Sequence, residues 1–287
     1  MQYVDMSVTF LYVFHSICTL LLRSFLDALP QQAYHHPINT NEKVTDMSTY
    51  CMSDIHGQID AFHQMLKTIH FSDEDTLYII GDVVDRGPCG VDILREVMRT
   101  PNITMILGNH ELMMREYLRP EATEKQISRW NRNRNQPTKA QFARLSESEQ
   151  KAVLDFLWGL PDCKALTVSG KDFFLVHGFP GENTHDRVWN RPDDVSVPNP
   201  MPEKILIVGH TPVSYLVSGS DEAEDRYLTK LEKAGKHVEI LHAPGFIDLD
   251  CSCGYPYHSC ALSCLRLDDM QEFYIPVYTD YSETSSI

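Results

Sequence analysis

The chain has 287 residues, with 40 Asp and Glu against 25 Lys and Arg, so its formal net charge is −15. Its 43% hydrophobic and 23% charged residues are typical of a globular protein and exclude collagen, a coiled coil and wholesale disorder. The charge also argues against a protein that coats nucleic acid or an anionic membrane, because both are polyanions.

The N-terminal segment 1–46 offers no residues to the chemistry developed below. Val8–Leu22 is its one membrane-like stretch, but it is short for a bilayer span, contains His15 and follows an acidic residue. A signal peptide or anchor stays open. The favoured interpretation is that Met47 is the start codon and that residues 1–46 are not native or are disordered.

The eight cysteines are too sparse and irregular for a secreted disulfide scaffold, which predicts reduced thiols and a cytoplasmic protein. Cys251, Cys253, Cys260 and Cys264 invite a zinc hypothesis. Their spacing lacks the paired pattern of zinc sites, so small buried thiols are the favoured reading.

One pattern recurs from Thr49 onward: a short apolar run ends in polar residues that could bind a metal. Such runs, rich in Ile, Val and aromatic residues, predict strands buried on both faces. Helical apolar spacing over 59–69 and 91–98 predicts an α/β fold, in which the functional site forms beyond the carboxyl ends of the strands. The five runs are Tyr50–Met52 before Asp54 and His56, Leu77–Ile80 before Asp82, Ile103–Leu107 before Asn109 and His110, Phe173–Val176 before His177, and Ile205–Val208 before His210.

Two insertions separate these runs. The polar, helix-like segment between Leu112 and Asp162 predicts a helical cap over about residues 113–162, whose Arg/Trp/Asn run at 129–134 is either a substrate-contacting lid or a solvated helix face. The charged segment Ser218–Lys236 predicts a surface helix or loop. Further strand-like runs follow at 238–241, 246–249, 262–267 and 273–278, so we expect one domain over 47–280 and a tail at 281–287.

The polar residues at the strand ends combine carboxylate, amide and imidazole donors. This mixture suits Mn²⁺, Fe or Zn²⁺ better than Ca²⁺ or a thiolate-type zinc site. There are too many donors for one ion, so the sequence predicts a centre of two divalent metal ions.

The order of these motifs resembles the calcineurin-like metallophosphoesterases, specifically their phosphoprotein-phosphatase-like bacterial and phage branch. The resemblance runs from Thr49 to about Asp269 and implies the fold of that family, a sandwich of two mixed β-sheets flanked by helices. Small departures are Ser53 in place of a common glycine, a shortened segment after His177, and Leu249-Asp250-Cys251 after Ile247-Asp248, where many relatives read Thr-Gly. The matching motifs are SDIHG (Ser53–Gly57), GDVVDRG (Gly81–Gly87), GNHE (Gly108–Glu111), LVHG (Leu175–Gly178), VWNR (Val188–Arg191) and VGHTP (Val208–Pro212).

The resemblance implies a metal role for six residues, with Mn²⁺ favoured over Fe or Zn²⁺. One ion would be held by the first motif and the other by the later motifs, with one carboxylate between them. The implied ligands are Asp54 and His56 for the first ion, Asp82 for both, and Asn109, His177 and His210 for the second.

The resemblance also implies how catalysis would proceed. The metal ions would activate a water to hydroxide, which would attack phosphorus while Arg86 and Arg191 bind the phosphoryl oxygens. His110, held cationic by Asp85, would protonate the leaving oxygen.

Less specific readings remain for several residues. Asp85 and Arg86 could form only a structural ion pair, and Glu111 is expected to be an ion-paired residue behind the ligands. Asp248 is expected to be structural. Six other histidines are expected to be ordinary surface or packing groups: His63, His70, His185, His237, His242 and His258.

The leading functional prediction is metal-dependent hydrolysis of phosphate monoesters by a serine/threonine-protein-phosphatase-like enzyme. The alternative is a symmetrical bis(5'-nucleosyl)-tetraphosphatase, and an inactive binding scaffold is the alternative of another class. The expected partners are a phosphorylated protein or a small phosphoester or nucleotide, with no nucleic-acid polymer and no membrane.

Overall fold

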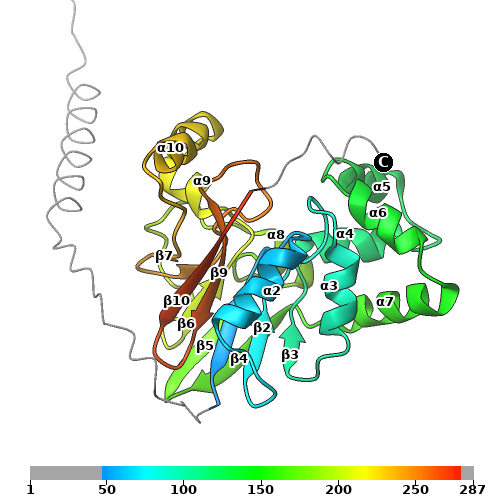
Figure 1. Cartoon of the computed structure of the whole chain (residues 1–287), viewed down its shortest axis with the longest axis horizontal. Helices are drawn as coiled ribbons and strands as arrows, with labels where there is room; N and C mark the ends of the chain where they lie inside the picture. The colour runs from blue at the N-terminus through cyan, green and yellow to red at the C-terminus, as the bar shows by residue number, and fades with distance from the viewer. Residues whose placement is uncertain (1–46, 279–287) are drawn as a thin grey trace, which may run out of the picture. The chain divides into compact units, whose positions relative to one another are not determined.

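The computed structural model describes residues 47–278, which form two five-stranded mixed sheets with helices around them (Figure 1). The predictions for residues 1–46 and for the tail at 281–287 lie outside the described residues. Within residues 47–278, no helix is both long enough and apolar enough to span a bilayer.

The first sheet has the strand order β10-β9-β1-β2-β3. Its strands β1, β2 and β3 are parallel, and β9 and β10 are added antiparallel to them. The predicted runs are confirmed as strands, although β2 and β3 end one or two residues earlier than expected. Their bounds are β1 Thr49–Met52, β2 Thr76–Ile79, β3 Ile103–Met105, β9 Cys260–Arg266 and β10 Gln271–Val277.

The second sheet has the order β4-β5-β6-β8-β7, with β5, β6 and β8 parallel. The antiparallel edge strand β4 was not predicted, because most of its side chains are at least partly exposed and it lacks a buried apolar run. The bounds are β4 Cys163–Val168, β5 Lys171–Val176, β6 Ile205–Val208, β7 Leu241–His242 and β8 Ile247–Asp248.

The predicted strand over 238–241 is wrong for its first three residues. Val238 donates its N–H to the Ser259 carbonyl (2.8 Å), and Ile240 donates its N–H to the Tyr274 hydroxyl (3.0 Å). These donors are therefore used outside a strand ladder, and the strand begins only at Leu241.

Apolar side chains between the two sheets join them into a sandwich. Strand β1 shows how: Cys51 belongs to the cluster that also holds Phe173 and Ile207 of the second sheet, whereas Tyr50 and Met52 belong to the cluster on the helix side. The expectation of strands buried on both faces is thus confirmed, and so is the predicted fold.

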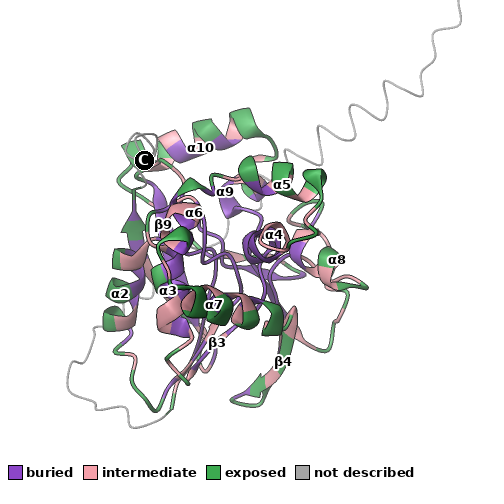
Figure 2. Cartoon of the chain, turned by 90° about the vertical axis from the view of Figure 1, so that its right-hand side faces the viewer, coloured by how far each residue is buried: buried purple, intermediate pink, exposed green. Residues whose placement is uncertain are grey.

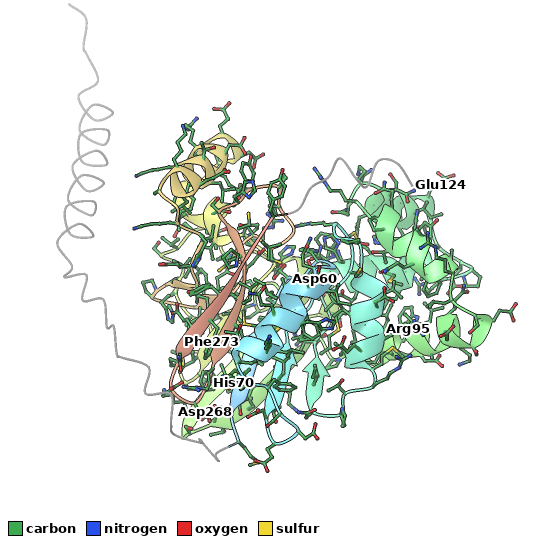
Figure 3. The ribbon with its side chains drawn as sticks, viewed as in Figure 1. Asp60, His70, Arg95, Glu124, Asp268 and Phe273 are labelled. Atoms are coloured by element: carbon green, nitrogen blue, oxygen red, sulfur yellow. The ribbon has the colours of Figure 1, made fainter. Side chains whose placement is uncertain are left out.

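Helices α2 (Ile59–Thr68) and α3 (Gly90–Val97) have the predicted apolar faces and pack beside the first sheet. Helix α4 (Asn109–Tyr117) leads into the segment predicted as a cap, which then carries α5 (Glu124–Asn131), α6 (Gln136–Ala143) and α7 (Glu147–Gly159). Thr123 and Ser146 begin α5 and α7 with capping boxes. Arg95, labelled in Figure 3, joins α3 to α7 through an ion pair with Glu149 (2.5 Å).

Three further helices follow the strands of the second sheet: α8 (Thr184–Trp189), α9 (Val213–Ser218) and α10 (Asp221–Lys233). The charged segment predicted as a surface helix or loop is mainly α10, which is exposed along most of its length (Figure 2). Only its inner face is buried, through Glu224 and Leu228.

Candidate metal centre and its pocket

All ten residues predicted for the site lie together beyond the carboxyl ends of the strands. Six of them have positive φ angles, although none is glycine, and a left-handed backbone is costly for such residues. This strain is tolerated where tight turns aim side chains at one point, as they do here. The six are Asp54, His56, Asp82, Asp85, Arg86 and His210.

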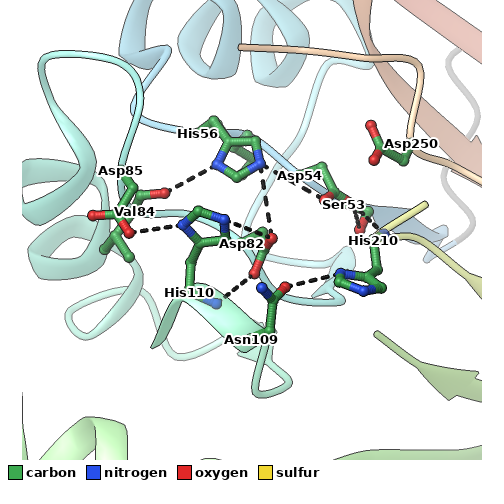
Figure 4. A network of polar contacts seen from close by, with 12 residues as sticks. Ser53, Asp54, His56, Asp82, Val84, Asp85, Asn109, His110, His210 and Asp250 are labelled. Atoms are coloured by element: carbon green, nitrogen blue, oxygen red, sulfur yellow. Dashed lines mark hydrogen bonds and ion pairs between the residues drawn. The ribbon is translucent and has the colours of Figure 1, made fainter. Parts of the chain in front are cut away.

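The first group of ligand atoms centres on His56. Its Nδ1–H donates to the Val84 carbonyl (3.1 Å), and burial, helped by Arg86 and His110, lowers its pKa well below the usual value. The ring is therefore neutral with a lone pair on Nε2, which has no hydrogen-bond partner within residues 47–278. Nε2 lies 3.8 Å from Asp54 Oδ1 and 3.7 Å from Asp82 Oδ2 (Figure 4). A lone pair facing two carboxylates is an arrangement that a cation between them would satisfy.

The second group repeats this arrangement around His177. Its Nδ1–H donates to the Ile80 carbonyl (2.7 Å), while Nε2 faces Asp82 Oδ1 at 3.2 Å and the side-chain amide of Asn109 at 2.9 Å. His210 Nδ1 also lies 2.9 Å from that amide. The donor set is imidazole, amide and carboxylate, which fits a divalent transition metal.

Electrostatics in the centre shows how strongly it attracts positive charge. Burial alone would lower the pKa of His177, but the carboxylates of Asp82 and Asp54 raise it to about 10. Burial alone would raise the pKa of Asp82, but the histidines around it, His177 first, hold it well below the usual value. Asp82 thus stays ionised between the two groups, where it could bind an ion in each.

His110 forms a hydrogen-bonded chain with the cap. Its Nδ1–H donates to Asp85 Oδ2 (2.7 Å), and the same oxygen accepts the indole N–H of Trp130 in α5 (2.7 Å). Burial opposes charging of His110, but Asp82 and Asp85 together raise its pKa. Nε2 of His110 lies 3.8 Å from Asp82 Oδ2, so it faces the centre and is close enough to His56 and Asp82 to join them as a ligand.

The loop that carries Asp82 and Asp85 is fastened at several points. Glu111 accepts backbone N–H groups from Asp82 (2.8 Å), Val83 (2.9 Å) and Val84 (3.1 Å). Its expected role behind the ligands is correct, but its partners are backbone amides, not a cation. Burial and the neighbouring Asp82 raise its pKa to about 7.

The cap holds the same loop from the other side. The N–H of Asp85 donates to the Thr138 hydroxyl (2.9 Å), and the N–H of Arg86 donates to the Arg134 carbonyl (3.0 Å). Of the two alternatives for the run 129–134, a wholly solvated helix face is wrong, and a substrate-contacting lid stays a prediction. Trp130 is fully buried against Asp85, while Arg132 and Arg134 are exposed.

A cavity of about 210 Å³ opens onto the centre. Both predicted phosphate-binding arginines line it, and the Nε–H of Arg191 donates to His210 Nε2 (3.3 Å). Several further lining residues had been given no role from the sequence, although Trp189 and Pro212 lie inside matching motifs and Asn133 in the run 129–134. They are Asn133, Trp189, Pro212, Tyr215, Asp221, Glu224 and Tyr255.

Two more buried carboxylates lie beside the centre. Asp248 accepts the N–H of Asp250 (2.9 Å), which agrees with its expected structural role. Asp250, which the sequence reasoning missed, accepts the N–H of Ser252 (2.9 Å) and lies on the Asp54 side of the centre (Figure 4). Burial, with the charge of Asp54, raises the pKa of Asp250 well above its usual value.

The four cysteines of the zinc hypothesis and two of the other histidines have the packing or surface roles expected of them. Cys251, Cys253, Cys260 and Cys264 are buried free thiols, and the clusters of metal-capable groups within residues 47–278 contain no cysteine. His63 pairs with Glu96 and His242 with Glu272 at the surface.

Comparison with known proteins identifies the family. A family model described as calcineurin-like phosphoesterase matches residues 47–243. The symmetrical bis(5'-nucleosyl)-tetraphosphatase of Yersinia pestis is 46% identical over 68 residues, which are 23% of this chain and 24% of that protein. A metallophosphoesterase structure from Sphaerobacter thermophilus has a TM-score of 0.50 and 18% identity, and the match covers 84% of this chain and 92% of that one.

The chain therefore belongs to the calcineurin-like phosphoesterases, a family of phosphoester-hydrolysing enzymes built around a dimetal centre. The resemblance stated from the motifs is confirmed. The chain spans about a quarter of the length of the curated relatives it matches, and the likeness to the Sphaerobacter structure concerns the fold alone.

Proposed function

We propose that the chain is a two-metal phosphoester hydrolase whose metal ligands are the six residues predicted from the motifs. The observation that carries the proposal is the pair of ligand groups that meet at Asp82, each with an imidazole nitrogen directed at carboxylate or amide oxygens. One ion would be held by Asp54, His56 and Asp82, and the other by Asp82, Asn109, His177 and His210.

When bound, two divalent ions would supply positive charge for the phosphoryl oxygens. They would also lower the pKa of a water, so that hydroxide is available near neutral pH to attack phosphorus. Arg86 and Arg191, on the cavity wall, would hold the other phosphoryl oxygens through charge-assisted hydrogen bonds. These contacts orient the substrate and strengthen as negative charge develops in the transition state.

His110 would act as the general acid. Asp85 holds its Nδ1–H, so its Nε2 is directed into the cavity that the substrate would fill. The raised pKa of His110 favours the cationic ring, which has a proton to give to the leaving oxygen.

Hydrolysis of p-nitrophenyl phosphate tests the proposed reaction. We expect turnover in the presence of Mn²⁺, loss of turnover with EDTA, and recovery when Mn²⁺ is added back; Fe and Zn²⁺ are tested in the same assay. The absence of chelator-sensitive turnover with every one of these metals would contradict the proposal and favour a binding scaffold.

A dinucleoside tetraphosphate is a second candidate substrate, favoured by the 46% identity to the Yersinia tetraphosphatase over 68 residues. The phosphoprotein substrate stays a prediction from the motifs. The same assay, run with a phosphoserine peptide and with diadenosine tetraphosphate, ranks the two by kcat/KM.

Trp130 would be a positioning residue for the acid. Trp130→Phe keeps the buried ring and removes only the N–H that donates to Asp85 (2.7 Å). We expect kcat on phenyl phosphate, a substrate with a poor leaving group, to fall about tenfold, since a hydrogen bond to a charged acceptor is worth ~1.5–3 kcal/mol. The loss should be smaller on p-nitrophenyl phosphate, which needs less help from an acid.

Trp158→Phe is the matched control, because Trp158 lies exposed on α7. It should leave both rates close to wild type. An equal loss on both substrates with Trp130→Phe would show a general structural role and not positioning of the acid.

A further inference from the structure

A second cavity, of about 220 Å³, adjoins the phosphate-binding one, and its lining is basic. The two cavities share Arg86, Asn133 and Tyr255. The other described residues that line the second cavity are Arg132, Arg134 and Pro256, so three of its six lining residues are arginines and none is acidic.

The arginines of this cavity are held in place by the cap and its neighbours. The Arg86 guanidinium lies over the Tyr255 ring, 4.9 Å from its centroid, and the Arg86 N–H donates to the Arg134 carbonyl (3.0 Å). Arg132 donates to the Ser128 hydroxyl (2.6 Å). Arg134 has φ = 54°, a left-handed conformation that is costly for an arginine and resembles that of the ligand-bearing turns.

The charges of this cavity are unusual for this chain. The net charge of the chain is −15, yet three arginines line this one cavity. An anion that enters the cavity could accept charge-assisted, bidentate hydrogen bonds from these arginines. The phosphate-binding cavity differs, because it also contains Asp82, Asp221 and Glu224.

Arg86 connects the two anion positions. It lines both cavities, so a group bound by Arg132 and Arg134 would be a close neighbour of the phosphoryl group under attack. Consecutive phosphates of one chain provide two anionic groups that are such close neighbours. A monoester of an alcohol provides only one.

We propose that Arg132 and Arg134 form, with Arg86, a subsite for a second phosphate group of the same substrate. The substrate class would then be an oligophosphate, in which one phosphate is attacked at the metal centre and an adjoining one lies in the arginine cavity. The proposal rests on the proposed hydrolase function for the attack itself, but the anion site can be tested separately.

The first test compares two substrates with the variant R132Q/R134Q. We expect kcat/KM on diadenosine tetraphosphate to fall roughly tenfold or more relative to its change on p-nitrophenyl phosphate, because only the first has an adjoining phosphate. Arg144→Gln, at an exposed position of the same cap, is the control and should not change this ratio. An unchanged ratio with R132Q/R134Q would overturn the proposal.

The second test measures binding and does not need turnover. Calorimetry with inorganic tripolyphosphate should give a dissociation constant about tenfold weaker for R132Q/R134Q than for wild type, with a much smaller change for orthophosphate. Equal changes for the two anions would contradict the subsite. If the wild type bound tripolyphosphate through these arginines but hydrolysed no substrate, the hydrolase proposal would fail while the anion site stood.

A third experiment distinguishes an oligophosphate substrate from a phosphoprotein substrate. A doubly phosphorylated peptide also offers two phosphates, but on separate side chains. A greater loss of kcat/KM for this peptide than for diadenosine tetraphosphate in R132Q/R134Q would overturn the assignment of the substrate class.

Discussion

Replacing Asp82 by asparagine is expected to abolish hydrolysis and to lower the content of both metal ions. Asp82 Oδ2 faces His56 Nε2 at 3.7 Å, and Asp82 Oδ1 faces His177 Nε2 at 3.2 Å, so one carboxylate serves both ligand groups. Asparagine keeps the shape but loses the charge and one of the two anionic oxygens. We expect activity to fall by roughly 10³-fold or more, since even changes behind the ligands cost 10–100-fold in metal affinity or activity.

The measurement is metal content of the purified variant together with turnover of p-nitrophenyl phosphate. Asp155→Asn, on the exposed side of α7, is the control and should retain both. If Asp82→Asn kept two ions per chain, the bridging role would be wrong. If it lost only one, Asp82 would belong to a single site.

His110→Asn is the second large effect, and its pattern differs. Removing a general acid costs about 10²–10⁴-fold in rate, and the cost is greatest when the leaving oxygen is a poor leaving group. We therefore expect a much larger loss of kcat on phenyl phosphate than on p-nitrophenyl phosphate, with metal content unchanged. Asp85→Asn should show the same pattern in weaker form, because Asp85 acts through the His110 ring.

Metal content is decisive for His110, because its Nε2 also lies within reach of the first ligand group. If His110→Asn lost metal together with activity, His110 would be a ligand and the assignment of the acid would fail. His242→Asn, at a surface ion pair far along the chain, is the matched control.

The site residues best predicted from the sequence are those that directly follow a buried apolar run. Each buried run of apolar residues predicted a strand, and the polar residue after it marked the carboxyl end. Parallel pairing of β1, β2 and β3, and of β5, β6 and β8, then brings these ends to one place, so Asp54 and His210 become neighbours although 156 residues separate them.

The sequence was least informative where a contact depends on how an irregular or inserted segment folds back. Trp130 bonds to Asp85 across 45 residues, and no periodicity marks that pairing. Asp250 is buried beside Asp54 through the loop after β8, in a motif where the family pattern is not matched. The edge strand β4 was missed because most of its side chains are at least partly exposed, so it has no buried apolar run. The strand predicted over 238–241 begins too early because the N–H of Ile240 donates to the Tyr274 hydroxyl and not to a neighbouring strand.

The three hydrogen bonds from the cap to the loop at 82–87 have a consequence for how this enzyme could diversify. Trp130, Arg134 and Thr138 bond to the loop that carries the proposed metal bridge, the proposed support of the acid and the proposed phosphate-binding arginine. The cap is therefore not an independent module that could be exchanged to alter substrate choice alone. A new cap would need to bring the same three anchor points, or the altered specificity would come with a slower enzyme.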